Sequence, residues 1–227
     1  KNIVAGSLKD CSARIMCAMS DFTDQEQVQK TFEDIDNRFD RLDFFIGNVM
    51  AKPEGYYDNI MEYTPEAWRK VIDANLTGTF FCCQEASAHM RRSSNGGSIV
   101  LLGSIYGIVG PDQRIYDGCS ADSNIYDSNA KLNAPVSYSA SKGALNALAK
   151  HMATSLGRDH IRVNTLIPGG IYDQQESKFH EAYIGKTILN RMAVWSDFNG
   201  AVLFLVSDAS RYMTGAELVI DGGWTAW

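Results

Sequence analysis

The 227-residue chain has little of what a disulfide framework, a metal site or a membrane span requires. Its five cysteines, at positions 11, 17, 82, 83 and 119, are scattered and include no Cys-x-x-Cys pair, which is typical of proteins from a reducing compartment. The four histidines are remote from one another and match no metal-ligand spacing, so we expect no metal. No run of 18 apolar residues is present, and we therefore expect no transmembrane helix.

Positive charge is also scarce. The 21 lysines and arginines are outnumbered by 27 aspartates and glutamates, which gives a formal net charge of −6. A broad nucleic-acid-binding surface is therefore not expected. Hydrophobic residues make up 45% of the chain, enough for a substantial core in one large domain. We predict a single cytoplasmic domain over residues 1–227, with no nucleic-acid or membrane partner.

Short apolar runs alternate with stretches of helical periodicity. Strands are predicted where Ile, Val, Leu and Phe cluster, over 13–19, 42–46, 98–102, 161–167 and 217–220. Helices are predicted over 24–40, 64–90, 137–157 and 196–206, with N-caps at Asp24, Thr64 and Ser196. This order predicts an α/β fold, with a doubly wound, mainly parallel sheet that helices cover on both faces.

Tyr138 and Lys142 lie four residues apart in the helix predicted over 137–157. Residues at that spacing share a helix face, so the phenol and the ammonium can point into one site. To exchange protons near neutrality, a tyrosine needs its pKa lowered by about three units from about 10, and a nearby cation stabilises the phenolate. Taken alone, however, a Tyr-x-x-x-Lys spacing is more often an ordinary amphipathic helix face.

Other polar residues follow the predicted strands. In a parallel sheet the carboxyl ends of the strands gather at one edge, where ligands bind. Asp21 follows the first predicted strand, and Asn48 follows the second. Ser104 follows the third, and Pro168-Gly169 ends the fourth. We therefore expect these residues to lie together at one edge of the sheet.

Together these segments resemble the short-chain dehydrogenase/reductase family in its compact form. Six segments, in order along nearly the whole chain, carry the resemblance: Asp21-Phe22-Thr23-Asp24, Asn75-Leu76-Thr77-Gly78, residues 97–104, Tyr138-Ser139-Ala140-Ser141-Lys142, residues 161–169, and the tail over 207–223. Any one of them is common, but six in register are specific. The resemblance implies a dinucleotide-binding fold and hydride transfer between NAD or NADP and a carbonyl or alcohol.

The resemblance also implies roles for single residues. Tyr138 would be the general acid and base, and Lys142 would lower its pKa and hold the nicotinamide ribose. Ser104 would donate a hydrogen bond to the substrate oxygen. Asn75 would hold a water in a proton relay to Lys142; its alternative reading is a polar residue that kinks a helix.

A second set of residues would bind the coenzyme. Asp21 would accept a hydrogen bond from the adenine amino group, or it is only a helix-capping acid. Pro168-Gly169 and Ile171 would line the nicotinamide face, or they form only a strand-ending turn. The full coenzyme set that the resemblance implies is Asp21, Phe22, Asn48, Tyr138, Lys142, Pro168, Gly169 and Ile171.

The sequence departs from the family near its start and in one turn. It holds no Thr-Gly-x-x-x-Gly-x-Gly phosphate loop, and it begins just before the segment that resembles the family's third strand. Because a sheet without its two central strands would expose apolar edges and faces, we expect the chain to be part of a longer protein. The coenzyme is then either NAD or NADP. In addition, Val49 and Met50 follow Asn48 where the family has Ala-Gly, which adds bulk beside the coenzyme path.

A third departure is an insertion between two catalytic positions. Residues 111–135 form an inserted loop that we expect to border the substrate cleft, or else to be a solvated flap. Its polar side chains favour a sugar or sugar derivative over a steroid or a fatty acyl chain. Candidate substrate contacts are Ser104, Tyr106, Gln113 and Arg114, the last of which can pair with an anion. Residues 171–192 are predicted to form a substrate lid.

Three functions fit these features. The first is an NAD(P)-dependent oxidoreductase that interconverts a polar ketone and a secondary alcohol. The second is a nucleotide-sugar epimerase or dehydratase that uses the same tyrosine and lysine, and the third is a catalytically inactive scaffold. Similarity to reductases of surface-glycan and flagellin-sugar pathways, through residues 104–107 and the Gly-Gly-Trp ending at Trp224, favours the first. By resemblance, helices 65–90 and 137–157 are oligomer faces, so we expect a homotetramer or dimer.

Overall fold

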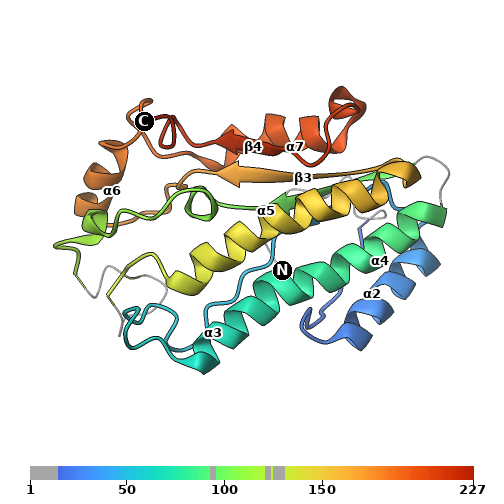
Figure 1. The fold of residues 1–227 in the computed structure, drawn as a ribbon, viewed down its shortest axis with the longest axis horizontal. Helices are drawn as coiled ribbons and strands as arrows, with labels where there is room; N and C mark the ends of the chain where they lie inside the picture. Colours follow the sequence, from blue (N-terminus) through green and yellow to red (C-terminus); the bar gives the residue numbers. More distant parts are fainter. Residues whose placement is uncertain (1–14, 93–95, 121–123, 125–130) are drawn as a thin grey trace.

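The structure is a computed structural model that describes residues 15–92, 96–120, 124 and 131–227. Its centre is a sheet of four parallel strands in the order β1-β2-β3-β4 (Figure 1). The strands are β1 (Phe44–Gly47), β2 (Gly97–Leu102), β3 (Ile161–Pro168) and β4 (Glu217–Ile220). They coincide closely with four of the predicted strands and confirm the parallel α/β class.

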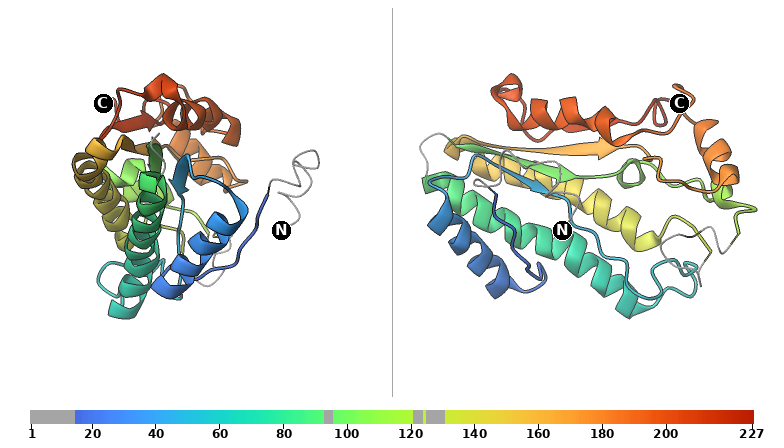
Figure 2. Two further views of the ribbon diagram at one scale, coloured as in Figure 1. Left: turned by 90° about the vertical axis from the view of Figure 1, so that its right-hand side faces the viewer. Right: turned by 180° about the vertical axis from the view of Figure 1, so that it is seen from behind.

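Helices cover both faces of the sheet, as Figures 1 and 2 show. The principal ones are α2 (Gln25–Arg38), α4 (Thr79–Arg92), α5 (Val136–Leu156) and α7 (Asn199–Val206). On one face, α2, α4 and α5 bury Ile99 and Leu101 of β2. On the other face, α7 packs Leu205 against Val100. Because successive side chains of β2 enter opposite layers, residues 99–102 of this strand are all apolar.

The strand predicted over 13–19 is wrong for the residues that the structure describes. Residues 15–20 form neither helix nor strand, and the side chain of Met19 is 88% exposed. A strand needs a neighbour for its backbone hydrogen bonds, and within the described ranges β1 pairs only with β2. Residues 13 and 14 lie outside the described residues.

Two predicted helix starts are confirmed. The Asp24 carboxylate accepts hydrogen bonds from the backbone N–H groups of Glu26, at 3.0 Å, and Gln27, at 3.3 Å, which caps α2. Thr64 Oγ1 accepts a hydrogen bond from Ala67 N at 3.1 Å at the start of α3 (Pro65–Ile72). In both cases a short polar side chain satisfies a backbone donor that has no partner within the helix.

The helix predicted as continuous over 64–90 contains a π-helical turn. This turn, η2 (Asp73–Gly78), lies between α3 and α4. Sequence periodicity did not predict it, because one i→i+5 turn barely changes the spacing of apolar residues. The turn places Asn75, which is fully buried, at the centre of the helical segment.

Gly78, at the end of η2, allows the segment after residue 20 to approach this helix. A Cβ built on Gly78 would lie 2.6 Å from the backbone oxygen of Phe22. Gly78→Ala is therefore expected to lower the free energy of unfolding by about 1–3 kcal/mol, measured by urea denaturation. Gly157→Ala is the matched control, since nothing lies within 4 Å of its Cβ position. Equal stability of the two variants would contradict this packing argument.

The second half of the chain contains a helix that the sequence did not predict. Helix α6 (Ser177–Ile184) lies within the polar segment after β3 and buries Phe179 and Tyr183. The remaining short elements are the 3₁₀ turns η3 (Ile105–Gly107), η4 (Gln113–Tyr116), η6 (Gly157–Asp159), η7 (Trp195–Phe198) and η8 (Asp208–Ser210). Of the predicted loop over 110–135, residues 121–123 and 125–130 lie outside the described residues.

Ser196 does not cap the helix that contains Leu205, contrary to prediction. It lies inside η7, and α7 starts only at Asn199. The Asp197 carboxylate accepts a hydrogen bond from Val194 N at 2.8 Å at the start of η7, whereas α7 has no side-chain cap. Among the described helices, none has the length and apolar character needed to cross a bilayer.

Candidate active site

The carboxyl ends of the strands bring the predicted site together. β1 ends at Gly47, directly before Asn48, and β2 ends at Leu102, two residues before Ser104. β3 ends at Pro168. Because β1, β2 and β3 are parallel neighbours, these ends lie at one edge of the sheet. Helix α5, which contacts β2, β3 and η3, brings Tyr138 to the same region.

The Ser104 side chain lies close enough to the Tyr138 phenol to favour the phenolate form. Ser104 is buried, and its Oγ accepts a hydrogen bond from Tyr106 N at 3.2 Å, which fixes the hydroxyl at the start of η3. Burial raises the pKa of Tyr138, and the neighbouring Ser104 side chain opposes this rise. In the structure, therefore, the pKa of Tyr138 moves in the opposite direction from the one that the predicted catalytic role requires.

Lys142 lies beside Tyr138 but donates its hydrogen bond elsewhere. Its Nζ is 5.8 Å from the centroid of the Tyr138 ring and donates to the backbone oxygen of Leu102 at 2.6 Å. Burial lowers the pKa of Lys142 to about 8. The predicted lowering of the tyrosine pKa by this ammonium is not found in the structure, because the ammonium bonds the end of β2 rather than the phenol.

The lowered pKa of Lys142 has a consequence for stability. Its value is 10.5 in water and about 8 in the folded chain, so the folded state is penalised when this lysine is charged. The penalty is complete below pH 8 and disappears as the pH rises to 10.5. Lys142→Met should therefore raise the free energy of unfolding at neutral pH by at most roughly 3 kcal/mol, and the gain should vanish near pH 10.5.

Urea unfolding of wild type and Lys142→Met at neutral and alkaline pH measures this difference. Lys30→Met is the control, because Lys30 is exposed on α2. It should show no pH-dependent difference from wild type. A stability difference of Lys142→Met that stays constant between the two pH values would contradict the prediction.

Asn75 connects three parts of the site. Its Oδ1 accepts a hydrogen bond from Ala51 N at 3.0 Å, in the segment after β1. Its Nδ2 donates to Ser141 Oγ at 3.0 Å, and Ser141 Oγ donates to the backbone oxygen of Tyr138 at 2.9 Å. The π turn thus orients a fully buried amide so that it joins α5 to the end of β1.

The predicted coenzyme residues lie at the same edge in different environments. The Asp21 carboxylate accepts hydrogen bonds from Thr23 N at 2.9 Å and Thr23 Oγ1 at 2.7 Å, and its pKa is lowered by these bonds. Phe22 packs against the core, and Asn48 is exposed. Pro168 pairs with Ile220 of β4, Gly169 is buried, and Ile171 forms an isolated bridge with Ala193.

The predicted substrate residues bond mainly within their own loop. The Gln113 amide exchanges two hydrogen bonds with the backbone of Ala134, at 2.9 and 3.2 Å. The Arg114 guanidinium holds both carboxylate oxygens of Asp112 at 2.8 Å. Tyr106 is half-buried, with its hydroxyl 3.5 Å from that of Tyr116.

The inserted loop is attached to helix α6. Lys186 contacts Asp112, and Lys178 Nζ donates to the backbone oxygen of Gly118 at 3.1 Å. The rings of Tyr116 and Phe179 stack with their centroids 5.2 Å apart. Sequence reasoning missed Phe179, Tyr183 and Trp224 as members of this contact, although Tyr183 and Trp224 have ring centroids only 4.4 Å apart. Aromatic residues in an apparently polar segment were the available signal.

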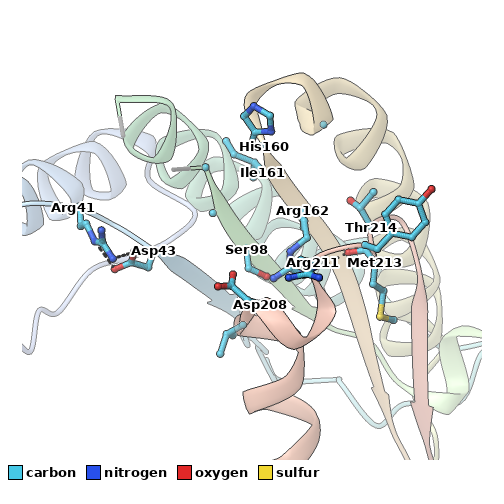
Figure 3. Close-up of a pocket in the computed structure, with 15 residues that line it drawn as sticks. Arg41, Asp43, Ser98, His160, Ile161, Arg162, Asp208, Arg211, Met213 and Thr214 are labelled. Carbon is cyan, nitrogen blue, oxygen red and sulfur yellow. Dashed lines mark hydrogen bonds and ion pairs between the residues drawn. The ribbon is translucent and has the colours of Figure 1, made fainter. Parts of the chain in front are cut away.

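Two sizeable cavities are present, and only the first lies at the opposite edge of the sheet from Ser104 and Tyr138. One, of about 780 Å³, is at the amino ends of β2 and β3 (Figure 3). There Arg162 donates to the backbone oxygens of Leu205, at 3.0 Å, and Ser207, at 3.2 Å, so its charge stabilises the end of α7. The other, of about 610 Å³, lies beside the start of α5 and is lined in part by Tyr57 and Asn133.

Two family models match the chain. The model described as short chain dehydrogenase matches residues 2–120, and the model described as enoyl-(acyl carrier protein) reductase matches residues 124–225. The chain is a short-chain dehydrogenase/reductase. This short-chain dehydrogenase/reductase is therefore an NAD(P)-dependent oxidoreductase, and the expected family and enzyme class are confirmed.

Individual relatives agree with this assignment. The chain is 31% identical over 215 residues to a 3alpha-hydroxysteroid dehydrogenase of Mediterraneibacter gnavus, covering 92% of this chain and 76% of the relative. It is 26% identical over 219 residues to an L-rhamnose 1-dehydrogenase (NAD(P)(+)) of a Sphingomonas species, with the same two coverages. A solved short-chain dehydrogenase of Leptospira borgpetersenii with bound NAD+ superposes with a TM-score of 0.76 at 33% identity, covering 92% of this chain and 74% of that one.

The described residues fit the nicotinamide part of such a coenzyme. The Lys142 ammonium carries three N–H donors, and the carbonyl oxygen of Leu102 accepts only one of them. Two charged donors are thus available for hydroxyl groups at the carboxyl edge of the sheet. Among the described residues, no group of three or more His, Cys, Asp or Glu side chains could hold a metal ion.

Proposed function

We propose that the chain interconverts a polar ketone and a secondary alcohol, such as a sugar or sugar derivative, with Tyr138 moving the proton. The observation that carries this proposal is that the Ser104 side chain and the buried Lys142 both lie beside the Tyr138 phenol. Two hydroxyl groups in contact can both bond the oxygen of one substrate. The nicotinamide coenzyme supplies or accepts the hydride when bound.

In the proposed mechanism, the chain binds and orients the substrate and moves one proton. Ser104 donates a hydrogen bond to the substrate oxygen and keeps it next to the Tyr138 hydroxyl. During reduction Tyr138 donates its proton to that oxygen, and during oxidation it accepts the proton. Lys142 would hold the ribose hydroxyls and stabilise the phenolate, and Asn75 would hold the relay water between Lys142 and solvent. The remaining coenzyme contacts would come from Asp21, Phe22, Asn48, Pro168, Gly169 and Ile171.

The proposed substrate class is supported by the polar loop over 111–135. Contacts of Asp112, Tyr116 and Gly118 with residues 178–186 support a substrate wall that this loop and the proposed lid over 171–192 would form together. One relative is named for L-rhamnose, a hydroxyl-rich sugar, and this name supports the proposed class. The relative named for a hydroxysteroid does not support it. We also propose a cytoplasmic location, because the four cysteines in the described ranges are free. A homotetramer or dimer is proposed as well.

A spectroscopic screen tests this function. The full-length protein is mixed with polyols, sugars and hydroxysteroids, each with NAD+ or NADP+, and the absorbance of the reduced nicotinamide is followed. Net reduction of coenzyme by polyols or sugars is the expected result. Conversion of a nucleotide sugar without net change in coenzyme would instead identify an epimerase or dehydratase, and no thermal shift with either coenzyme would identify a scaffold.

A further inference from the structure

Two buried oxygen atoms near Lys142 have no hydrogen-bond partner. They are Oδ1 of Asn146, a residue that is 6% exposed, and Oγ1 of Thr165, a residue that is 0% exposed. Buried polar atoms in folded proteins are almost always bonded to protein or to an ordered water. Ser139 Oγ also has no partner among the described residues, but Asn146 and Thr165 flank one backbone position, so a single ligand can bond both.

Both residues face the same short piece of backbone. A Cβ built on Gly103 would lie 3.1 Å from Asn146 Oδ1 and 2.9 Å from Thr165 Cγ2. Asn146 is on α5, one turn after Lys142, and Thr165 is on β3. Gly103 directly follows Leu102, whose backbone oxygen accepts the hydrogen bond from Lys142. The two oxygens and the lysine therefore belong to one junction, where α5, β2 and β3 meet.

The chemistry of the two oxygens defines the ligand. An amide oxygen only accepts hydrogen bonds, whereas a threonine hydroxyl can both donate and accept. A ligand that satisfies both must donate to the first and be able to accept from the second. Lys142, one turn before Asn146 on α5, carries an ammonium, which disfavours a cation, and the amide oxygen disfavours an anion. Water is the neutral molecule of this size with both capacities.

We propose that Asn146 and Thr165 are positioning residues that hold a buried water against the Leu102–Gly103 backbone. This water joins α5 to β3 behind Lys142. It fixes the segment that leads from β2 to Ser104, and so keeps Ser104, Tyr138 and Lys142 at constant separation. The positioning role rests on the proposed function of these three residues. The presence of the water does not depend on that function.

A matched pair of substitutions at position 165 tests the proposal. Thr165→Val keeps the shape of the side chain and removes the hydroxyl, while Thr165→Ser keeps the hydroxyl. We expect Thr165→Val to lower Tm and to lower kcat by about fivefold with an unchanged KM for the coenzyme, because the water loses one of its bonds. We expect Thr165→Ser to retain most of the wild-type kcat. A crystal structure of the full-length protein with coenzyme should show a water within hydrogen-bond distance of both oxygens.

The possible results separate the two parts of the proposal. If Thr165→Val unfolds at the wild-type Tm or above it, the site is dry and the proposal is overturned, because removing an unbonded buried hydroxyl does not cost stability. If Tm falls while kcat is unchanged, the positioning role is overturned. Since Tm and the crystal structure are read without any substrate, they test the water even if the proposed reaction proves wrong.

Discussion

Tyr138→Phe should lower kcat by about a thousandfold while coenzyme binding stays within about twofold of wild type. The substitution removes one oxygen atom and keeps the ring, which packs against the cluster of Tyr56, Tyr57 and Val71. The proposed general acid is therefore removed without loss of the fold. Initial rates with the substrate found in the screen, together with coenzyme titration by fluorescence, measure the two effects.

The control for this experiment is Tyr212→Phe. Tyr212 is fully exposed, so removing its hydroxyl should leave kcat unchanged. Ser104→Ala offers a second comparison, since it removes the other hydroxyl of the pair and leaves the proton donor in place. Turnover by Tyr138→Phe at more than a tenth of the wild-type rate would rule out this tyrosine as the proton donor.

Asn75→Ala should have the largest effect on stability. The substitution leaves the half-buried Ala51 N–H without its acceptor and the fully buried Ser141 Oγ without one of its partners. The expected loss is about 2–4 kcal/mol in the free energy of unfolding, measured by urea denaturation. Because the same bonds join α5 to the end of β1, we also expect kcat to fall.

Asn199→Ala is the matched control for Asn75. Asn199 is exposed at the start of α7, so this substitution should change stability by less than about 0.5 kcal/mol. A loss at Asn75 no larger than the loss at Asn199 would show that the amide does not hold the π turn in place. The Asn75→Asp variant, which keeps the acceptor for Ala51 N but replaces the donor to Ser141, should lie between the two.

Local chemistry explains which elements could be predicted from the sequence. Helix α2 was predicted because Asp24 caps it and Val28 and Phe32 lie four residues apart on its buried face. Helix α6 was not, although Phe179 and Tyr183 have the same four-residue spacing, because it has only eight residues and no side-chain cap. Its stability comes from packing against the inserted loop and Trp224, which no local pattern records. The run over 13–19 shows the reverse, since an apolar segment forms a strand only where a neighbour pairs with it.

The same distinction applies within the site. That Ser104, Tyr138 and Lys142 converge could be predicted from motif order and from the geometry of parallel sheets. Two other features could not be predicted: the hydrogen bond from Lys142 to Leu102, and the partners of Gln113 and Arg114 within the loop. Each depends on backbone positions that only the tertiary fold fixes. Polar side chains in a loop have many partners available, and sequence alone does not rank them.

The π turn also sets the direction of the helix that follows it. Buried residues recur every four positions from Ala67 through Val71 and Asn75 to Thr79. In an uninterrupted α-helix such a row would wind steadily around the axis, since four residues exceed one turn of 3.6. The π turn contains more residues per turn, which compensates for this rotation, so the row of buried residues keeps facing the sheet. Deleting a single residue from η2 would rotate the whole of α4 about its axis and expose its apolar side, so natural insertions and deletions should avoid this turn.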